Sequence, residues 1–179
     1  ARHQHVERTG VRVDAGIVSS WIHGELAAGG RIEIQGPLGE CVYEPVEQER
    51  SLLLIGTGCG LAPLRGIIHS ALREGHCGSI HLFHGSRGID GVYLVEEMRA
   101  VNKEHPQFSY TACLSDGSVR EGYSAGRAAD VALDRHPRLT GWRVYLCGNS
   151  AMVKATRRRA FLAGAALQHI HSDPFEFSH

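Results

Sequence analysis

The sequence predicts an α/β protein built on a doubly wound parallel sheet of five strands, with helices on both faces. Two observations lead to this fold class. From about residue 50 onward, short apolar runs alternate with longer helical stretches, which is the pattern of consecutive strand–helix units. Four of these runs also end in glycine or small polar residues, as strands do where the chain turns into a helix. The length of 179 residues suits one such domain, or one domain and a fragment of another.

The strands are expected where apolar and β-branched residues run together. The run Leu52-Leu53-Leu54-Ile55 has no polar interruption, which is typical of a parallel strand buried on both faces. The expected strands span residues 51–55, 79–84, 108–114, 143–147 and 169–172. Ligands of such sheets bind beyond the carboxyl ends of the strands, so the residues that follow each strand are the first candidates for a site.

The helices are expected between these strands. They span residues 62–74, 93–104, 125–134 and 151–163. Gly75 and Gly164 follow two of them and Pro106 limits a third, and both residue types commonly end helices.

The first 45 residues do not show this alternation of apolar strands and helices. An amphipathic segment lies around residues 17–26, and a short alternating strand is expected over residues 31–35, between Gly29-Gly30 and Gly36-Pro37. One strand and one helix of this size do not bury enough surface to be stable alone. This segment therefore either packs on the rest of the chain or is the end of a domain that starts before residue 1, and we expect the boundary at residues 45/46.

Composition narrows the function classes. Lys and Arg together number 19, as do Asp and Glu, so the net charge is zero and a nucleic-acid binder held by bulk positive charge is not expected. No apolar stretch reaches the roughly 18 residues that cross a bilayer, and the polar start does not resemble a signal peptide. The five cysteines are widely spaced without a CxxC pair, so we expect no metal site and a reduced, cytoplasmic protein.

The strongest local signal is the segment Gly56-Thr57-Gly58-Cys59-Gly60-Leu61-Ala62-Pro63. It lies between a buried strand and a helix start, where backbone amides and the helix dipole favour an anion. It is not a P-loop, because no Gly-Lys-Ser/Thr follows, and its third glycine comes one position too early for GxGxxG. The segment thus predicts either a phosphate-binding turn or a tight turn that holds no ligand.

The second signal is Tyr145-Leu146-Cys147-Gly148-Asn149-Ser150-Ala151-Met152, in which Cys147 ends a strand and a helix follows. In this place Cys147 is a candidate nucleophile or a polar contact for a cofactor ring. A nucleophile needs a nearby base, and His84 is the only histidine at a strand end. The alternative is that Cys147 is a small buried hydrophobic residue, as most free cysteines are.

With these motifs about 90 residues apart, the chain resembles the pyridine-nucleotide half of the ferredoxin–NADP reductase family, close to the flavin-dependent reductases that serve oxygenases. The first motif is similar to the family's GTGxGxxP pyrophosphate loop, and the second to its CGxxxM segment, whose cysteine lies beside the nicotinamide. The ending Asp173-Pro174-Phe175-Glu176-Phe177 is similar to the acidic–aromatic C-terminus near the flavin. The resemblance implies a Rossmann-like domain that binds NADH or NADPH and delivers hydride to FAD, from which single electrons pass to a ferredoxin or oxygenase component.

The same resemblance implies the roles of individual residues. Cys147 and Glu176 are the implied catalytic residues. The implied cofactor contacts are Gly56, Thr57, Gly58, Gly60 and Pro63 at the pyrophosphate, Gly148 and Met152 at the nicotinamide, Ser115 and Asp116 at the adenosine, and Phe177 near the flavin.

Residues 1–45 resemble the C-terminal remnant of the family's FAD-binding barrel, which makes residues 46–179 the NAD(P)H-binding domain. Gly16 and Ser19 match the GxxSxxL segment that holds the flavin pyrophosphate at a helix start. The family's other flavin motif, Arg-x-Tyr-Ser/Thr, is absent from this chain. We therefore expect FAD to bind only where the rest of the barrel is present, and the isolated chain to bind nucleotide without reducing an acceptor.

Asp116 favours NADH over NADPH. It stands where NADP-specific relatives carry an arginine for the 2′-phosphate, and a carboxylate there would accept a hydrogen bond from a free 2′-hydroxyl and repel a phosphate dianion. Three nearby cations could instead bind a 2′-phosphate and so favour NADPH: Arg87, Arg120 and Arg127. Asp116 is alternatively a plain turn residue before Gly117.

Two other function classes stay open at the level of the sequence. One is a non-catalytic nucleotide-binding or regulatory module, and the other is a hydrolase with Cys147 as its nucleophile. A basic cluster, Lys154 with Arg157, Arg158 and Arg159, is either a docking face for an acidic electron acceptor or a solvated helix face.

Overall fold

The computed structural model describes residues 5–8, 11–14, 17–34, 39 and 41–175. The chain divides into two units, Ala1–Leu38 and Gly39–His179. The contacts thus divide the chain at residues 38/39, ahead of the boundary expected at 45/46, because the segment that begins at Cys41 packs on the second unit.

The first unit contains a hairpin and one helix. Strands β1 (His5–Arg8) and β2 (Val11–Asp14) pair antiparallel, and helix α1 (Ile17–Gly24) lies within the predicted amphipathic segment. The strand predicted over residues 31–35 is wrong for residues 31–34, which form no strand; Gln35 lies outside the described residues. In the described part of this unit β1 and β2 pair only with each other, so the alternating run has no partner to hydrogen-bond with.

The second unit is a parallel sheet of six strands in the order β6-β5-β4-β3-β7-β8. The strands are β3 (Leu52–Thr57), β4 (Ile80–Ser86), β5 (Phe108–Leu114), β6 (Ser124–Ala125), β7 (Arg143–Asn149) and β8 (Ile170–Phe175). The predicted fold class is confirmed, but the predicted count of five strands is one too low. The missed strand, β6, has two residues that pair with Cys113 and Leu114, and a strand this short carries no periodic signal.

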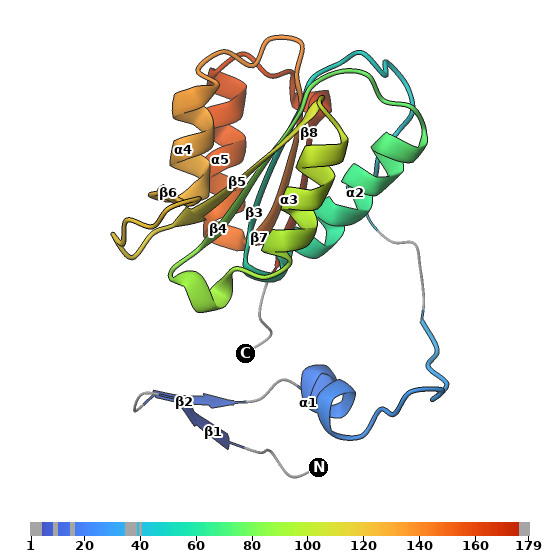
Figure 1. Ribbon diagram of the computed structural model, residues 1–179, viewed down its shortest axis with the longest axis vertical. Helices are drawn as coiled ribbons and strands as arrows, with labels where there is room; N and C mark the ends of the chain where they lie inside the picture. The colour runs from blue at the N-terminus through green and yellow to red at the C-terminus, as the bar shows by residue number, and fades with distance from the viewer. Residues whose placement is uncertain (1–4, 9–10, 15–16, 35–38, 40, 176–179) are drawn as a thin grey trace. The chain divides into compact units, whose positions relative to one another are not determined.

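Four helices cover the two faces of this sheet (Figure 1). Helices α2 (Leu61–Arg73) and α3 (Val95–Glu104) lie on one face, and α4 (Ala128–Arg135) and α5 (Ser150–Leu162) on the other. Three short 3-10 turns complete the described elements: Gly58–Gly60, Ile89–Gly91 and Leu167–His169. Within the described residues, no helix combines the length and the apolar character needed to span a bilayer.

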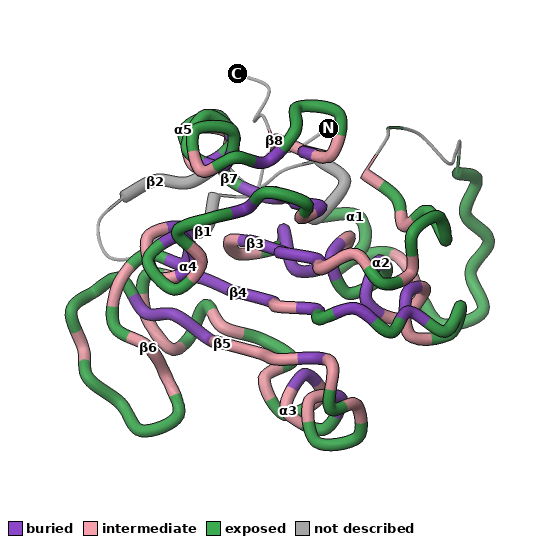
Figure 2. Tube along the Cα trace, turned by 90° about the horizontal axis from the view of Figure 1, so that it is seen from above, coloured by how far each residue is buried: buried purple, intermediate pink, exposed green. Residues whose placement is uncertain are grey.

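Two apolar cores hold these layers together, and alternate residues of each central strand contribute to them. Leu53 and Ile55 pack toward α4 and α5, whereas Leu52 and Leu54 pack toward α2 and α3. All four are buried, as expected for a strand covered on both faces. Figure 2 shows the buried residues along the strands and on the inner sides of the helices.

The order of the strands also locates the site. After β3 the chain builds outward through β4, β5 and β6, and then returns to place β7 on the other side of β3. The strand order therefore reverses between β3 and β7. Open α/β sheets bind ligands beyond the carboxyl ends of the strands at such a switch point, which is where both glycine-containing motifs lie.

Candidate functional site

The first turn at the carboxyl edge of the sheet leads from β3 into α2. Gly58 has φ +53°, a left-handed conformation that favours glycine, and the 3-10 turn Gly58–Gly60 runs directly into α2 at Leu61. A Cβ atom on Gly60 would overlap the carbonyl oxygen of Cys147 and lie 2.8 Å from the amide nitrogen of Gly148. The first turn is thus packed backbone-to-backbone against the second, and only glycine fits at position 60.

The second turn leads from β7 into α5. Gly148 has φ +116°, and a Cβ atom there would lie 2.5 Å from the carbonyl oxygen of Thr57. The backbone amide of Asn149 donates to Oγ1 of Thr57 at 3.1 Å, while Oδ1 of Asn149 accepts from the amide of Met152 at 3.1 Å and caps α5. The two turns therefore hold each other in place and bring the N-termini of α2 and α5 to the same edge of the sheet.

A groove of about 740 Å³ opens beside these turns. It is lined by Thr57, Gly58, Cys59, Gly85, Ser86, Arg87, Ser115, Arg127, Ala128, Ala129, Asp130, Asn149, Ala151, Met152, Ala155, Thr156, Arg159 and Phe175. Residues from five strand ends and from α4 and α5 thus meet in one place. The volume is in the range of 300–1,000 Å³ typical of small-molecule sites.

The groove contains some of the residues singled out in the sequence and not others. Thr57, Gly58, Ser115 and Met152 line it directly. Six others do not line it: Gly56, Gly60, Pro63, Cys147 and Gly148 lie in or next to the two turns, and Asp116 lies two residues after the end of β5. Gly16, Glu176 and Phe177 lie outside the described residues, and Ser19 lies in α1, where its side chain is not described.

The charge of the groove is mainly positive. Its lining includes the guanidinium groups of Arg87, Arg127 and Arg159 against one carboxylate, Asp130. Nη1 of Arg159 lies 2.5 Å from Oδ1 of Asp130, so the charges of these two side chains largely neutralise each other. Arg87 and Arg127 add positive charge beside the helix N-termini, and both features favour an anionic ligand.

Asp116 is held in a local turn next to the groove. Its Oδ1 accepts hydrogen bonds from the backbone amide and the hydroxyl of Ser118, at 2.9 and 2.6 Å. These hydrogen bonds lower the pKa of the Asp116 carboxyl, which is therefore ionised at neutral pH. The residue is both a turn residue and a fixed negative charge close to Ser115.

Cys147 points away from the groove. Its side chain is buried on the α2 face of the sheet, and its Sγ lies 3.5 Å from Sγ of Cys41. Its pKa is raised, first by the hydrogen bond with Cys41 and then by burial. A thiol with a raised pKa is a poor nucleophile at neutral pH.

His84 does not serve Cys147 as a base. The register places His84 of β4 opposite Gly56 of β3, which in turn pairs with Cys147 of β7, so the two residues are two strands, or about 10 Å, apart. His84 contacts Tyr110 and Tyr93 instead, and burial lowers its pKa. This geometry does not support a Cys–His hydrolase.

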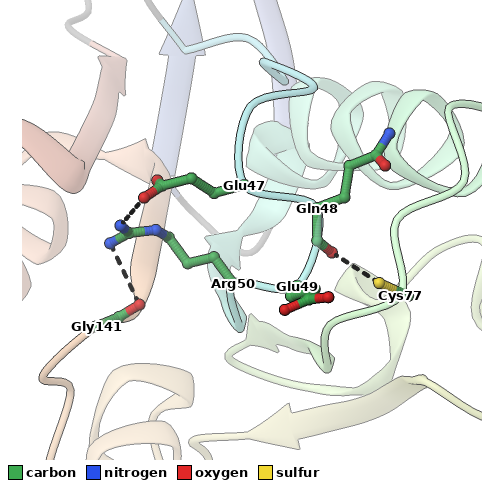
Figure 3. A pocket seen from close by; sticks show the side chains of 6 residues that line it. All are labelled: Glu47, Gln48, Glu49, Arg50, Cys77 and Gly141. Atoms are coloured by element: carbon green, nitrogen blue, oxygen red, sulfur yellow. Dashed lines mark hydrogen bonds and ion pairs between the residues drawn. The ribbon is translucent and has the colours of Figure 1, made fainter.

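A second hollow, of about 640 Å³, lies at the opposite, amino edge of the sheet (Figure 3). It is lined by Glu47, Gln48, Glu49, Arg50, Cys77 and Gly141. The guanidinium of Arg50 donates to Oε1 of Glu47 and to the carbonyl of Gly141, at 2.6 and 3.3 Å, and so bridges its two sides. Its polar groups largely bond to one another, so this hollow is a poorer candidate than the groove at the carboxyl edge.

Several groove residues escaped the sequence analysis as members of a site. Three of them lie on the sides of α4 and α5 and belong to no motif: Asp130, Ala155 and Thr156. The sequence indicates Arg159 only as part of a basic helix face. Asn149 is part of the second motif, and an asparagine at the end of a strand and directly before a helix is a detectable capping signal.

Comparison with known proteins agrees with this geometry. The sequence signature of the oxidoreductase NAD-binding domain matches residues 54–158. The ferredoxin–NAD(P)(+) reductase component of the naphthalene 1,2-dioxygenase/salicylate 5-hydroxylase systems of Ralstonia sp. is 34% identical over 91% of this chain and 49% of its own length. The reductase component of the naphthalene 1,2-dioxygenase system of Pseudomonas putida is 33% identical over 92% and 50%, respectively.

Among solved structures, the cytochrome P450 reductase GcoB of Amycolatopsis is similar at a TM-score of 0.78. It is 34% identical, and the match covers 88% of this chain and 47% of that protein. The chain therefore spans about half the length of the curated relatives it matches.

Proposed function

This chain belongs to the ferredoxin–NADP reductase family by its oxidoreductase NAD-binding domain, and we propose from this premise that residues 46–179 bind NAD(P)H as the nucleotide-binding part of a flavin-dependent reductase. The observation that carries the proposal is the pair of interlocked turns at the switch point of the sheet. They align two helix N-termini beside a positively charged groove.

The residues present fit a dinucleotide. A Cβ atom would collide with backbone at Gly60 and at Gly148, so the chain keeps both turns tight enough for a ligand's phosphates to approach main-chain amides. We assign the pyrophosphate to Gly56, Thr57, Gly58, Gly60 and Pro63, and the adenosine to Ser115 and Asp116. The nicotinamide is assigned to the turn of Cys147 and Gly148 and to Met152.

The residues of this chain bind and orient the dinucleotide and do not themselves react with it. A bound NAD(P)H would supply a hydride, for which FAD would be the acceptor in a complete reductase. The amides of the first turn fix the phosphates, and the hydrogen bond from the Asn149 amide to Thr57 keeps the second turn in register with them. The buried thiol of Cys147 fills the space behind the second turn, which excludes water from that side.

The matched part makes up about half the length of the curated relatives, so the activity of a whole reductase is proposed from them. We propose that residues 1–45 are the end of an FAD-binding barrel, with Gly16 and Ser19 at the flavin, and that Glu176 and Phe177 lie near the junction of the two cofactors. The named activities of the relatives support electron delivery to an iron–sulfur or haem-type acceptor, such as a ferredoxin or an oxygenase component. The free cysteines support a reducing, cytoplasmic location.

We further propose that the site prefers NADH. The fixed charge of Asp116 lies next to Ser115 and would repel a 2′-phosphate, and Arg159 is already paired with Asp130. Arg87 and Arg127 are the cations that would oppose this preference.

Titration of the purified chain with NADH and NADPH tests both proposals. Ala155 is an exposed groove residue on α5, so Ala155→Phe should fill the groove and weaken NADH binding at least about tenfold, which is 1.4 kcal/mol. Ala100→Phe is the matched control, because Ala100 is an exposed helical alanine on α3, away from the groove. Equal binding by the two variants would reject the groove as the site, and tighter binding of NADPH than of NADH would reject the preference.

A further inference from the structure

Two cysteines that are far apart in sequence meet behind the second turn. Sγ of Cys41 and Sγ of Cys147 are 3.5 Å apart, across 106 residues of chain. The other three cysteines lie elsewhere: Cys59 and Cys77 are exposed, and Cys113 is buried in the core on the opposite face of the sheet. The pair joins the segment that enters the sheet unit to the strand that carries the proposed nicotinamide turn.

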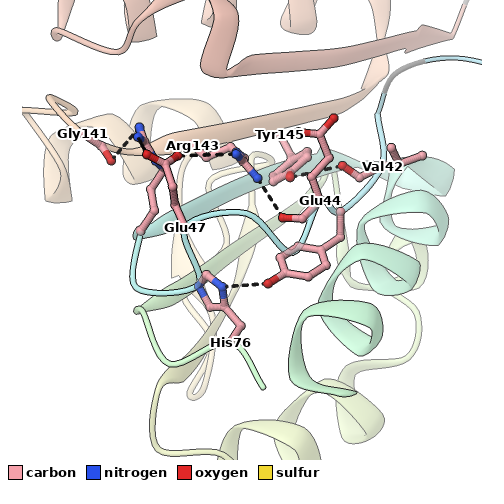
Figure 4. Close-up of polar contacts among 9 residues, drawn as sticks. Val42, Glu44, Glu47, His76, Gly141, Arg143 and Tyr145 are labelled. Carbon is pink, nitrogen blue, oxygen red and sulfur yellow. Dashed lines mark hydrogen bonds and ion pairs between the residues drawn. The ribbon is translucent and has the colours of Figure 1, made fainter. Parts of the chain in front are cut away.

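The segment that carries Cys41 is held against the sheet by a series of polar contacts (Figure 4). The hydroxyl of Tyr145 donates to the carbonyl of Val42 at 3.3 Å, and Nη1 of Arg143 donates to the carbonyl of Glu44 at 3.1 Å. The hydroxyl of Tyr43 lies 3.1 Å from Nδ1 of His76. These contacts fix the backbone on the C-terminal side of Cys41, so the proximity of the two sulfur atoms is built into the packing.

The remaining separation is small compared with what a bond requires. A disulfide has an S–S distance of about 2.05 Å, so the sulfur atoms must approach by roughly 1.5 Å. Cys41 is only partly buried, so it is open to a small oxidant. Cys147 is fully buried, and its sulfur atom contacts that of Cys41.

The two thiols differ in acidity. The hydrogen bond with Cys147 lowers the pKa of Cys41, and the same contact raises the pKa of Cys147. Cys41 is also the partly exposed member of the pair, whereas Cys147 is buried, so Cys41 is the thiol that meets and attacks an oxidant first. Once Cys41 is no longer a thiolate, the charge that opposes ionisation of Cys147 is removed.

We propose that Cys41 and Cys147 form a peroxide-sensitive pair that closes to an intramolecular disulfide. In the first step the Cys41 thiolate attacks hydrogen peroxide, the O–O bond breaks, and with one proton taken up the products are a sulfenic acid and water. In the second step the Cys147 thiol attacks the sulfur of that sulfenic acid, an S–S bond forms, the S–O bond breaks, and a second water leaves. In total, the two thiols lose two electrons, and one hydrogen peroxide accepts them and is reduced to two waters.

The disulfide should also weaken nucleotide binding, and this consequence rests on the proposed function. The backbone at Cys147 and Gly148 is packed against Gly60 without room for a Cβ atom. Drawing Cys147 toward Cys41 therefore shifts the second turn relative to the first. We expect a several-fold rise in the Kd for NADH after oxidation, reversed by dithiothreitol.

Differential alkylation with peptide mapping of the full chain tests the pairing. After treatment with hydrogen peroxide, we expect a cross-linked peptide containing Cys41 and Cys147. Cys41→Ser should abolish it, and Cys77→Ser, which changes an exposed cysteine at the amino edge, should leave it intact. Persistence of a free Cys147 thiol in the wild-type chain while Cys41 is oxidised would overturn the proposal.

A kinetic comparison makes the test independent of the variants. The cross-link should form at least about tenfold faster in the folded chain than in the chain unfolded by urea, because folding holds the sulfur atoms together. Equal rates would overturn the proposal even if Cys41→Ser failed to fold. Failure of the reduced chain to bind NADH would count against the proposed function alone, whereas a cross-link without a change in Kd would overturn only the effect on the site.

Discussion

The two edges of the parallel sheet carry hollows of similar size, about 740 Å³ at the carboxyl edge and about 640 Å³ at the amino edge, but they differ in their chemistry. At the carboxyl edge, two glycine turns and the N-termini of helices face the groove. At the amino edge, charged side chains bridge one another and the backbone, as Arg50 does between Glu47 and Gly141. Volume alone therefore does not distinguish a binding site from a gap in the packing.

The direction of the strands explains this difference. In a parallel sheet with crossover helices, every strand end that leads into a helix lies at one edge, so the positive ends of the helix dipoles collect there. The amino edge receives the C-terminal ends of the same helices, together with the segment that enters the sheet. It is accordingly closed by a polar network around Arg143, which is 3% exposed, and His76.

The largest expected effect follows from Gly60 at the carboxyl edge. Gly60→Ala places a methyl group against the backbone of Cys147 and Gly148, so the two turns must separate. We expect a loss of stability of about 1–3 kcal/mol, as in other overpacked sites. We also expect at least a tenfold weaker affinity for NADH, about 1.4 kcal/mol. Chemical denaturation and fluorescence titration measure the two effects.

Two matched glycine variants sharpen this prediction. Gly66→Ala lies in α2 with nothing within 4 Å of the added methyl group, so it should keep the affinity and gain up to about 1 kcal/mol of helix stability. Gly78→Ala at the amino edge would meet the carbonyl oxygen of Glu49 at 2.5 Å, so it should lose stability while the folded fraction binds NADH normally. If Gly78→Ala and Gly60→Ala weakened the affinity equally, the contrast between the two edges would fail.

A smaller effect is expected from pH, acting on the polar network of the amino edge. His76 is 3% exposed, and burial lowers its pKa in the folded chain. Below about pH 6.5 the unfolded chain therefore binds a proton at His76 more readily than the folded chain does. The free energy of unfolding keeps its full contribution from neutral His76 above this pH and decreases as the pH falls below it. We expect the unfolding midpoint to fall by a few degrees between about pH 7.5 and pH 5.5.

His76→Gln serves as the comparison for this pH dependence. Burial also lowers the pKa values of His81, His84 and His136, so part of the effect should remain in the variant. The variant should nevertheless lose less stability on acidification than the wild-type chain. Identical pH profiles, measured by thermal unfolding, would show that His76 does not contribute.

The sequence predicts the carboxyl edge better than the amino edge, for a physical reason. Glycines at strand ends and apolar strands are local features, so the turn Gly56–Pro63 and the strand at Leu52–Ile55 were both visible before the structure. The strand expected over residues 31–35 is wrong for residues 31–34, because alternation specifies a strand only when a partner strand is present. The two residues of β6 are too few to show any period.

The contents of the groove and the network of the amino edge depend on long-range packing. Asp130 and Thr156 face the groove because of the way α4 and α5 lie on the sheet, which their own sequence does not encode locally. The contact of Cys41 with Cys147 spans 106 residues, and no spacing rule connects the two positions. Such pairs become visible only once the chain is folded.

The smallest effect is expected at Glu47, in the hollow of the amino edge. Its carboxylate lies 2.6 Å from Nη2 of Arg50 and 3.8 Å from Nη2 of Arg143, but the side chain is 48% exposed, so solvent screens both ion pairs. Glu47→Gln should lower the unfolding midpoint slightly, and added salt should reduce the difference. The Kd for NADH should change by less than about twofold, or 0.4 kcal/mol. A larger change in Kd would mean that the amino edge takes part in binding, and the absence of any salt dependence would mean that Glu47 acts through packing instead of charge.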